Sequence, residues 1–495
     1  MTRIAIVLSL TVALFAACSK DDAAAPGQKV VEPGVSAVPA SELGPNTDVK
    51  VEEISITTAS EDARRQFVRG RELFENVRHA EAVAYFDKAI ELDPGFALAH
   101  AYRGSALPGD EGRAELERAL ELARSHPHPE KLVVESMLLK RKGDVDGRAR
   151  VVEELVRVAP GDFRVHVWYA ALLQEAGKVD GALAAYEQAA RLAPGAAELH
   201  NHLAYLHAFK GNMKNAVVAA RKYASLKPGE PNPQDTLGEM LLMAGELEQS
   251  EQAFLRALEV EPSFSIAWEG VAMARFYRDD WKAGFEAYGK ARDGAPDGDA
   301  RRKMTARLAW AHLAAGDLPA ALAEAETVTK GAELDGLMLA AELHAMAGKR
   351  DEARELLDSA CALVGDDPAD VETHAWATIT SVIVEVEDGK LDAAKKALAD
   401  VTEHEAKMEN SYFRYGAAYA RGIVALANNN GEEALKQLAK ISNPLLPYGL
   451  QAQWKTVDAL QLVGRAGDAK ALAERLRSAK RRQVFALVLQ SRNRS

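Results

Sequence analysis

The feature that most constrains the fold of this 495-residue sequence is a ladder of evenly spaced prolines. It consists of Pro160, Pro194, Pro228, Pro262 and Pro296 at intervals of 34 residues, preceded by Pro94 and Pro127 at intervals of 33. Each proline follows an apolar helical pattern such as "ARLAPG". Because proline lacks an N–H and disfavours helix in the residue before it, each one ends a helix. The ladder therefore predicts a chain of short helical units.

Each unit contains a second break near its middle, usually at a glycine. These glycines are Gly143, Gly177, Gly211, Gly245, Gly316, Gly348 and Gly389. Glycine adopts the positive φ that ends a helix at little cost, so each unit is predicted to be two helices joined by a tight turn.

Small residues recur in phase within these units and allow two helices to approach closely. One set is Ala170, Ala182, Tyr186 and Ala189, and the equivalent sets are Gly70, Ala82, Phe86 and Ala89, then Gly238, Ser250, Phe254 and Ala257, then Ala272, Gly284, Tyr288 and Ala291. This pattern resembles the tetratricopeptide repeat from about residue 63 onward. The resemblance implies an all-α fold, a right-handed α-solenoid of about 12 helix-turn-helix units in which stacked neighbours bury a continuous apolar face.

The array divides into a regular part and a degenerate part. Residues 61–296 keep the repeat closely, whereas residues 297–495 keep it more loosely. The last stretch, "GDAKALAERLRSAKRRQVFALVLQS", is predicted to be a C-terminal capping helix. Its basic residues, which suit a solvated cap, are Arg475, Arg477, Lys480, Arg481 and Arg482.

The N-terminus combines a basic start with a short apolar run. Arg3 precedes "IAIVLSLTVALFAA", which is shorter than the roughly 20 residues that a membrane-spanning helix needs, so it is typical of a secretory signal peptide. "FAAC", from Phe15 to Cys18, resembles the lipobox of bacterial lipoproteins. The resemblance implies cleavage after residue 17 and lipid attachment to Cys18. The alternative is ordinary secretion, with Cys18 incidental.

Residues 18–60 are rich in Ala, Pro, Gly and acids, which predicts a flexible tether. Its end, "VKVEEISIT", is predicted to add a short extended piece against the first helix. A lipid on Cys18 implies a protein anchored in the bacterial cell envelope and facing the periplasm. Ser19 after the cysteine favours the outer membrane, by resemblance to enterobacterial sorting.

Composition and motifs exclude several functions. A formal net charge of −12 argues against nucleic-acid binding, which rests on neutralising phosphates. Two cysteines cannot form a disulfide framework or a structural zinc site. The sequence has no Gly-rich phosphate loop, no HExxH pair and no Gly-x-Ser-x-Gly elbow. We therefore expect no enzyme activity, no cofactor and no metal. An enzyme, a hydrolase or transferase with a site assembled from scattered residues, is one alternative, and a purely structural spacer is another.

Histidines and a cysteine are the remaining candidates for chemistry. The histidines fall at two repeat positions, the fourth (His100, His166 and His200) and the eleventh (His207, His312 and His344), which predicts structural roles. His126, His128 and Glu130 could form an adventitious metal site, but two imidazoles lack committed further ligands. Asp144 and Asp146 resemble a calcium loop without its remaining ligands. Cys361, on an apolar helix, is predicted to be a buried thiol.

A partner surface can be mapped by resemblance to the repeat family. In that family the first helix of each unit lines the concave face through its second, fifth, ninth and twelfth residues. The corresponding residues are Asn201, Tyr205, Asp235, Glu239, Met273, Phe276, Trp310, Met338 and Glu342. This mixture suits an extended or helical peptide with basic and apolar side chains. The alternative is that the large residues only fill the inner wall. The function expected is a lipid-anchored scaffold or adaptor that binds a protein or peptide partner in envelope assembly, pilus or polysaccharide export.

Overall fold

The structure, a computed structural model, describes residues 53–75, 78–330, 333–363, 368–407, 413–441, 448–480 and 489. The leader, Cys18 and the tether up to residue 52 lie outside the described residues. Across the described ranges all regular secondary structure is helical, and the α-helices run from α1 to α24. Consecutive helices pack against each other in pairs, α1 with α2 and so on to α23 with α24. The prediction of an all-α solenoid of about 12 helix pairs is confirmed.

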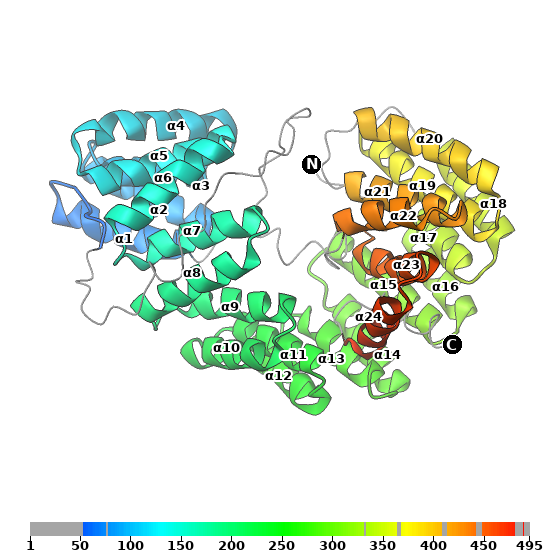
Figure 1. Ribbon diagram of the computed structural model, residues 1–495. Coiled ribbons are helices and arrows are strands. Elements are labelled where there is room, and N and C mark those ends of the chain that lie inside the picture. Colours follow the sequence, from blue (N-terminus) through cyan, green and yellow to red (C-terminus); the bar gives the residue numbers. More distant parts are fainter. Residues whose placement is uncertain are drawn as a thin grey trace. The chain divides into compact units, whose positions relative to one another are not determined.

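The helices belong to two compact units, and the boundary between them in the sequence falls between Pro228 and Gly229 (Figure 1). The first unit contains α1 (Glu61–Glu75), α2 (His79–Leu92), α3 (Ala97–Ala106), α4 (Gly109–Leu122), α5 (His128–Lys142), α6 (Val145–Val158), α7 (Phe163–Glu175), α8 (Val179–Leu192), α9 (Ala197–Phe209) and α10 (Met213–Leu226). The second unit contains α11 (Pro231–Ala244), α12 (Leu247–Val260), α13 (Ala267–Phe276), α14 (Trp281–Asp293), α15 (Gly298–Ala314), α16 (Leu318–Thr329), α17 (Glu333–Met346), α18 (Arg350–Ala362), α19 (Pro368–Glu387), α20 (Leu391–Lys407), α21 (Phe413–Ala427), α22 (Gly431–Leu438), α23 (Gly449–Leu462) and α24 (Ala466–Ser478).

The turns inside the pairs use the left-handed backbone conformation, as the glycine pattern predicts. All seven glycines of that pattern have positive φ, from +69° at Gly143 to +85° at Gly316. In the pair α13–α14 the same place is taken by Asp279, with φ +60°, 34 residues after Gly245. Aspartate tolerates this region better than most residues because its short side chain bonds locally. A search for glycine alone therefore misses this turn.

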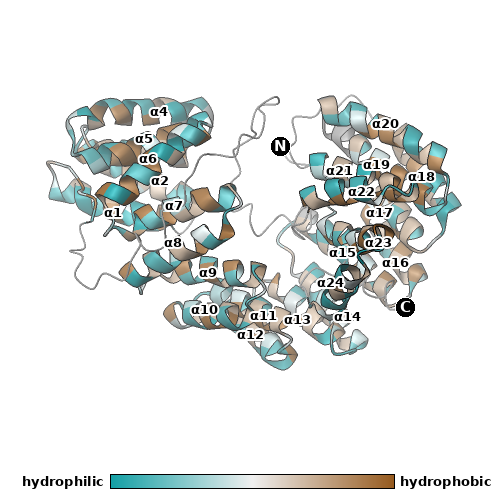
Figure 2. Cartoon of the chain, in the orientation of Figure 1, coloured by the Kyte–Doolittle hydropathy of each residue, from teal (hydrophilic) through white to brown (hydrophobic). Residues whose placement is uncertain are grey.

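The in-phase small residues lie where helices pack most closely. Phe254 on α12 is fully buried, and its ring lies between Gly238 on α11 and Gly270 on α13. A Cβ on Gly238 would lie 2.7 Å from the ring, closer than a real Cβ packs. One aromatic ring thus joins the two helices of a pair to the next pair. Apolar residues are accordingly spread along both units (Figure 2).

The segment 53–60 ahead of α1 contacts acids at the ends of three helix pairs, α1–α2, α5–α6 and α7–α8, and so extends beyond the predicted contact with the first helix. Three carboxylates accept its hydrogen bonds. Asp162 accepts from the Ile54 N–H at 3.0 Å, Glu130 from the Thr57 hydroxyl at 2.6 Å, and Asp93 from the Thr58 hydroxyl at 2.6 Å. Asp162 also caps α7, and Asp93 closes its own loop through the Gly95 N–H. The same acids therefore close loops between units and hold the incoming chain.

Two predictions about individual elements need correction. The predicted capping helix continues through the basic run, but α24 ends at Ser478 and Ala479 is extended, with ψ +126°. Cys361 is exposed and not buried. The buried residues of α18 are Ala353, Leu357 and Ala360, and a residue one step after Ala360 is rotated about 100° away from that face.

Candidate partner-binding face

The inner face of the second unit is built by the first helix of each pair, and a buried ionic group marks it. Glu269 on α13 is 5% exposed. One carboxylate oxygen accepts a hydrogen bond from the Tyr288 hydroxyl at 2.7 Å, and the other accepts from Arg307 Nη1 on α15 at 2.6 Å. A buried carboxylate needs such partners, because losing either would leave a charge without compensation in the core.

A second polar contact between the first helices of consecutive pairs lies farther along the unit. The Thr380 hydroxyl on α19 lies 3.5 Å from the carboxylate of Glu342 on α17. Burial raises the pKa of Glu342 well above its ordinary value. Burial, followed by the nearby Glu342, also raises the pKa of Tyr448, the N-cap residue just before α23. The Tyr448 ring stacks on Tyr419 with centroids 4.7 Å apart. Helices α17, α19, α21 and α23 therefore meet around one half-buried acid.

The two polar pairs share one spacing. Glu269 and Arg307 are 38 residues apart, and so are Glu342 and Thr380. One repeat is 34 residues long. A spacing of 38 residues therefore joins a residue on the first helix of one unit to a residue that lies one helical turn farther along the first helix of the next unit. Because first helices neighbour one another on the inner side of a curved stack, these pairs define the inner face.

The residues mapped to the groove differ in their accessibility. Asn201 and Tyr205 on α9 are half-buried, and so is Glu342. Asp235 and Glu239 on α11 are 4% and 6% exposed, respectively. The remaining four, Met273, Phe276, Trp310 and Met338, are between 0% and 4% exposed. Of the nine mapped residues, Asn201, Tyr205 and Glu342 are therefore partly exposed, and the other six are buried.

Phe276 and Met273 belong to the core between helices. The Phe276 ring lies 5.0 Å from Trp281 and 5.3 Å from Phe285, measured between centroids, and packs over Gly284. Met273 is fully buried in the same cluster. At these two positions the structure supports the alternative that large residues fill the wall.

The sequence mapping omitted Glu269, whose two carboxylate oxygens accept hydrogen bonds from Tyr288 and Arg307. It occupies the same repeat position as Asn201 and Asp235, at successive intervals of 34 residues. The 34-residue interval that separates the prolines predicts this position, because one more interval after Asp235 leads to residue 269.

The histidines hold units together, as their repeat positions predict. His100 Nε2 lies 3.1 Å from the Pro94 carbonyl, and His166 Nε2 lies 2.8 Å from the Pro160 carbonyl. These two fourth-position histidines thus donate to the carbonyl of the proline that precedes their unit. His126 bonds to Glu130 and His128 faces Glu154, so the "SHPHPE" histidines have different partners. Within the described residues no group of three or more His, Cys, Asp or Glu is arranged to hold a metal ion.

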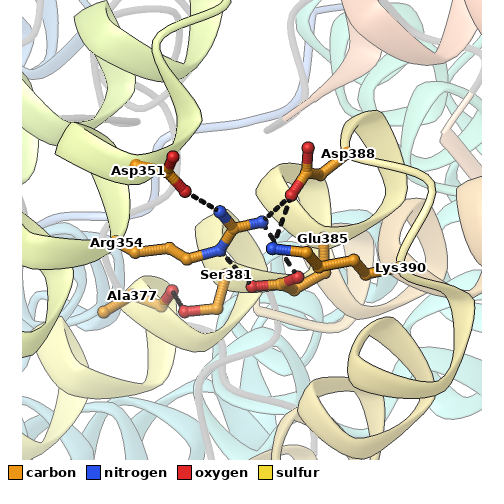
Figure 3. A network of polar contacts seen from close by, with 7 residues as sticks. All are labelled: Asp351, Arg354, Ala377, Ser381, Glu385, Asp388 and Lys390. Atoms are coloured by element: carbon orange, nitrogen blue, oxygen red, sulfur yellow. Dashed lines mark hydrogen bonds and ion pairs between the residues drawn. The ribbon is translucent and has the colours of Figure 1, made fainter.

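An ionic cluster at Arg354 joins α18 to α19 (Figure 3). The guanidinium donates from Nε and Nη2 to the two oxygens of Glu385 at 2.7 and 3.1 Å, and it also bonds Asp351 and Asp388. Hydrogen bonds from Lys390 and Arg354 lower the pKa of Asp388 to about 2. The bonds from Arg354 to Glu385 and Asp388 link α18 to α19 and the turn after it, whereas the bond to Asp351 stays within α18, so this cluster stabilises the array.

No helix in the described part of the chain is both long enough and apolar enough to span a bilayer.

The folded part thus defines a class, the scaffold proteins made of stacked helical pairs. Sequence models of the tetratricopeptide repeat match residues 63–96, 135–197, 170–231, 306–368 and 381–444. Over these ranges the chain consists of tetratricopeptide repeats. This repeat is a protein-interaction module, so the chain is a scaffold for protein–protein interaction.

The chain is similar to several solved structures that are distant from it in sequence. A tetratricopeptide repeat protein from Parabacteroides merdae is 17% identical over 50% of this chain and 97% of its own, with a TM-score of 0.40. The C-terminal part of a repeat protein from Cytophaga hutchinsonii is 17% identical over 55% of this chain and 99% of its own, with a TM-score of 0.37. MamA from Desulfovibrio magneticus is 16% identical over 33% and 93%, with a TM-score of 0.32. No curated protein matches the sequence.

Proposed function

We propose that this protein is a lipid-anchored scaffold of the bacterial cell envelope that faces the periplasm and binds a protein or peptide partner on the concave side of its repeats. The observation that carries the proposal is the combination of "FAAC" at residues 15–18 with an array that shows twelve helix pairs in the described part of the chain. The lipid would hold the protein at the membrane, and the array would supply the binding surface.

The face itself indicates the chemistry of the partner. Asn201 and Tyr205 present an amide and a phenol from α9, and Glu342 presents an acid from α17. Groups of this kind on the first helices of a stack suit an extended or helical segment with basic and apolar side chains. Envelope assembly, pilus or polysaccharide export machinery would provide partners of this kind.

The anchor is tested by metabolic labelling with palmitate in the native bacterium. We expect the wild-type chain to be labelled and to fractionate with the outer membrane, and the Cys18→Ser chain to be unlabelled. Labelling of the Cys18→Ser chain, or none of the wild type, would contradict the anchor.

The binding face is tested by photo-crosslinking in intact cells from position 205. We expect the probe at Tyr205 to trap a defined partner, and a probe at exposed Val218 on α10 to trap none. An Asn201→Ala, Tyr205→Ala chain should lose co-purification of that partner with its helical content unchanged. Equal capture from both probe positions would count against the face.

A further inference from the structure

The first unit contains an ion pair between two helices that are not neighbours in the stack. Arg164, the second residue of α7, donates from Nε to the carboxylate of Glu75, the last residue of α1, at 2.8 Å. Two complete helix pairs, α3–α4 and α5–α6, lie between α1 and α7 in the sequence. In a simple solenoid each repeat contacts only its neighbours. The first unit is therefore coiled tightly enough to bring its first and fourth helix pairs together.

The arginine of this ion pair is held in place by further groups. Its side chain is 16% exposed, and the guanidinium lies 4.4 Å from the centroid of the Phe163 ring and 3.7 Å from the Asp162 carboxylate. Arg71 on α1 lies 3.9 Å from the same Glu75 carboxylate. Exposed ion pairs contribute little, partly because two long side chains must be ordered to form them. Phe163 and Asp162 already order Arg164, so this pair can hold α1 against α7.

The extended segment 53–60 spans the same helix pairs. Read backwards from α1, it bonds Asp93 at the end of α2, then Glu130 at the start of α5, then Asp162 at the start of α7. Asp162 serves both contacts, because one of its oxygens accepts from the Ile54 N–H and the other from the Arg164 N–H. The segment and the ion pair therefore meet at Asp162.

Tyr102 on α3 lies beside the ion pair. It is 4% exposed, and its ring lies 5.3 Å from Phe67 and 5.4 Å from Phe74 of α1, measured between centroids. Burial, followed by the charge of Glu75, raises the pKa of the Tyr102 hydroxyl, and the charge of Arg164 on α7 acts on the same group. Tyr102 is therefore close to both α1 and α7, and separation of these helices would uncover it.

We propose that the first unit is held closed by a latch that consists of the Arg164–Glu75 ion pair and the segment 53–60. With both parts in place, α1 stays against α7 and Tyr102 stays covered. Release of the segment removes the Ile54 bond from Asp162, weakens the hold on Arg164 and lets the unit open. A pull on the preceding chain would act first on that bond. Only the source of the pull, a membrane anchor, rests on the proposed function; the latch does not.

The ion pair is tested by the distance between two spin labels, measured by electron paramagnetic resonance. The full-length chain carries Cys18→Ser and Cys361→Ser, with labels at the exposed positions of Glu72→Cys on α1 and Arg191→Cys at the end of α8. We expect one narrow distance in this chain. Adding Arg164→Met should give a longer mean distance and a broader distribution, with the helical content unchanged.

Two further variants make this result specific. Glu75→Ala, at a half-exposed position that tolerates the change, should lengthen the distance as Arg164→Met does. Arg148→Met is the matched control, because Arg148 is 11% exposed and bonds Glu175 at 2.9 Å between the neighbouring helices α6 and α7. It should leave the distance unchanged. A wild-type distance in Arg164→Met and Glu75→Ala, or equal lengthening in Arg148→Met, would overturn the proposal.

The segment is tested by the same pair of labels. Thr57→Val with Thr58→Val removes the hydroxyls that bond Glu130 and Asp93, so the distance should again become longer. Ser55→Ala, at an exposed position of the segment, should have no effect. An unchanged distance in the double valine chain would overturn the role of the segment in the latch. The purified chain needs neither lipid nor partner, so failure of the palmitate experiment would leave these distances unaffected.

Discussion

At the residue scale, the array depends on side chains that fit one another in pairs of helices and on a few polar groups with fixed partners. The Phe254 ring needs the absence of a side chain at both Gly238 and Gly270. His166 needs the Pro160 carbonyl. In each case the sequence shows the residue and its period, and the contact explains why that residue type recurs.

Gly270→Ala tests the close approach of α12 and α13. The added Cβ would overlap the buried Phe254 ring, so we expect the free energy of unfolding to fall by about 1–3 kcal/mol, the usual cost of overpacking. The measurement is urea unfolding followed by circular dichroism. Gly289→Ala is the matched control, because a Cβ there meets nothing within 4 Å and alanine favours helix by about 0.5–1 kcal/mol. Equal destabilisation by both changes would refute the packing role.

His166 makes stability depend on pH. Burial lowers its pKa, and Nδ1 is buried with no hydrogen-bond partner among the described residues, so protonation would place an unpaired N–H in the core. The unfolded chain takes up that proton near pH 6.5, whereas the folded chain resists it. This contribution to stability is therefore complete above pH 6.5 and is lost as the pH falls through the lowered pKa.

The corresponding measurement compares urea midpoints at about pH 7.5 and 5.5. We expect His166→Gln to lose less stability on acidification than the wild type, whereas His128→Gln, at an exposed position, should behave as the wild type does. An unchanged pH response of His166→Gln would contradict the assignment.

At the element scale, the extended segment 53–60 couples the incoming chain to three helix pairs. Its hydrogen bonds end on acids that already serve the loops between units, so the segment and the loops support each other. A tether anchored in this way would transmit a pull to several pairs at once and not to α1 alone.

Glu130→Ala tests this coupling. The change leaves the Thr57 N–H, the Thr57 hydroxyl and His126 without their shared acceptor, so we expect a loss of about 1–3 kcal/mol in the free energy of unfolding. Limited proteolysis near residue 57 should also become faster. Glu121→Ala, which removes an exposed ion pair with Arg124, should change stability by no more than about 0.5 kcal/mol. If residue 57 stays protected in Glu130→Ala, the carboxylate does not hold the segment.

At the scale of the whole molecule, stability is distributed along a row of pairs. Each pair contacts its neighbours, so the effect of a change should decay with distance along the stack. The return of Lys480 to Gly245 adds a long-range contact within the second unit.

Hydrogen exchange of Gly270→Ala measures that decay. We expect faster amide exchange in α11–α16, around the altered contact, and unchanged exchange in α2–α5 of the first unit, because nearest-neighbour terms carry the energy. A uniform increase across both units would show a single cooperative block and would contradict this expectation.

The sequence alone determined the helix pairs, their breaks and most of their turns. Proline, glycine and in-phase small residues act on the local backbone, so their meaning does not depend on distant contacts. Which inner residues are covered was decided only in three dimensions. The curvature of a solenoid is the sum of small rotations over many pairs, and no short motif contains that sum. Only the folded stack brings Lys480 to α11 and Leu489 between α17 and α23, and it buries Phe276 where the repeat pattern predicts an open wall.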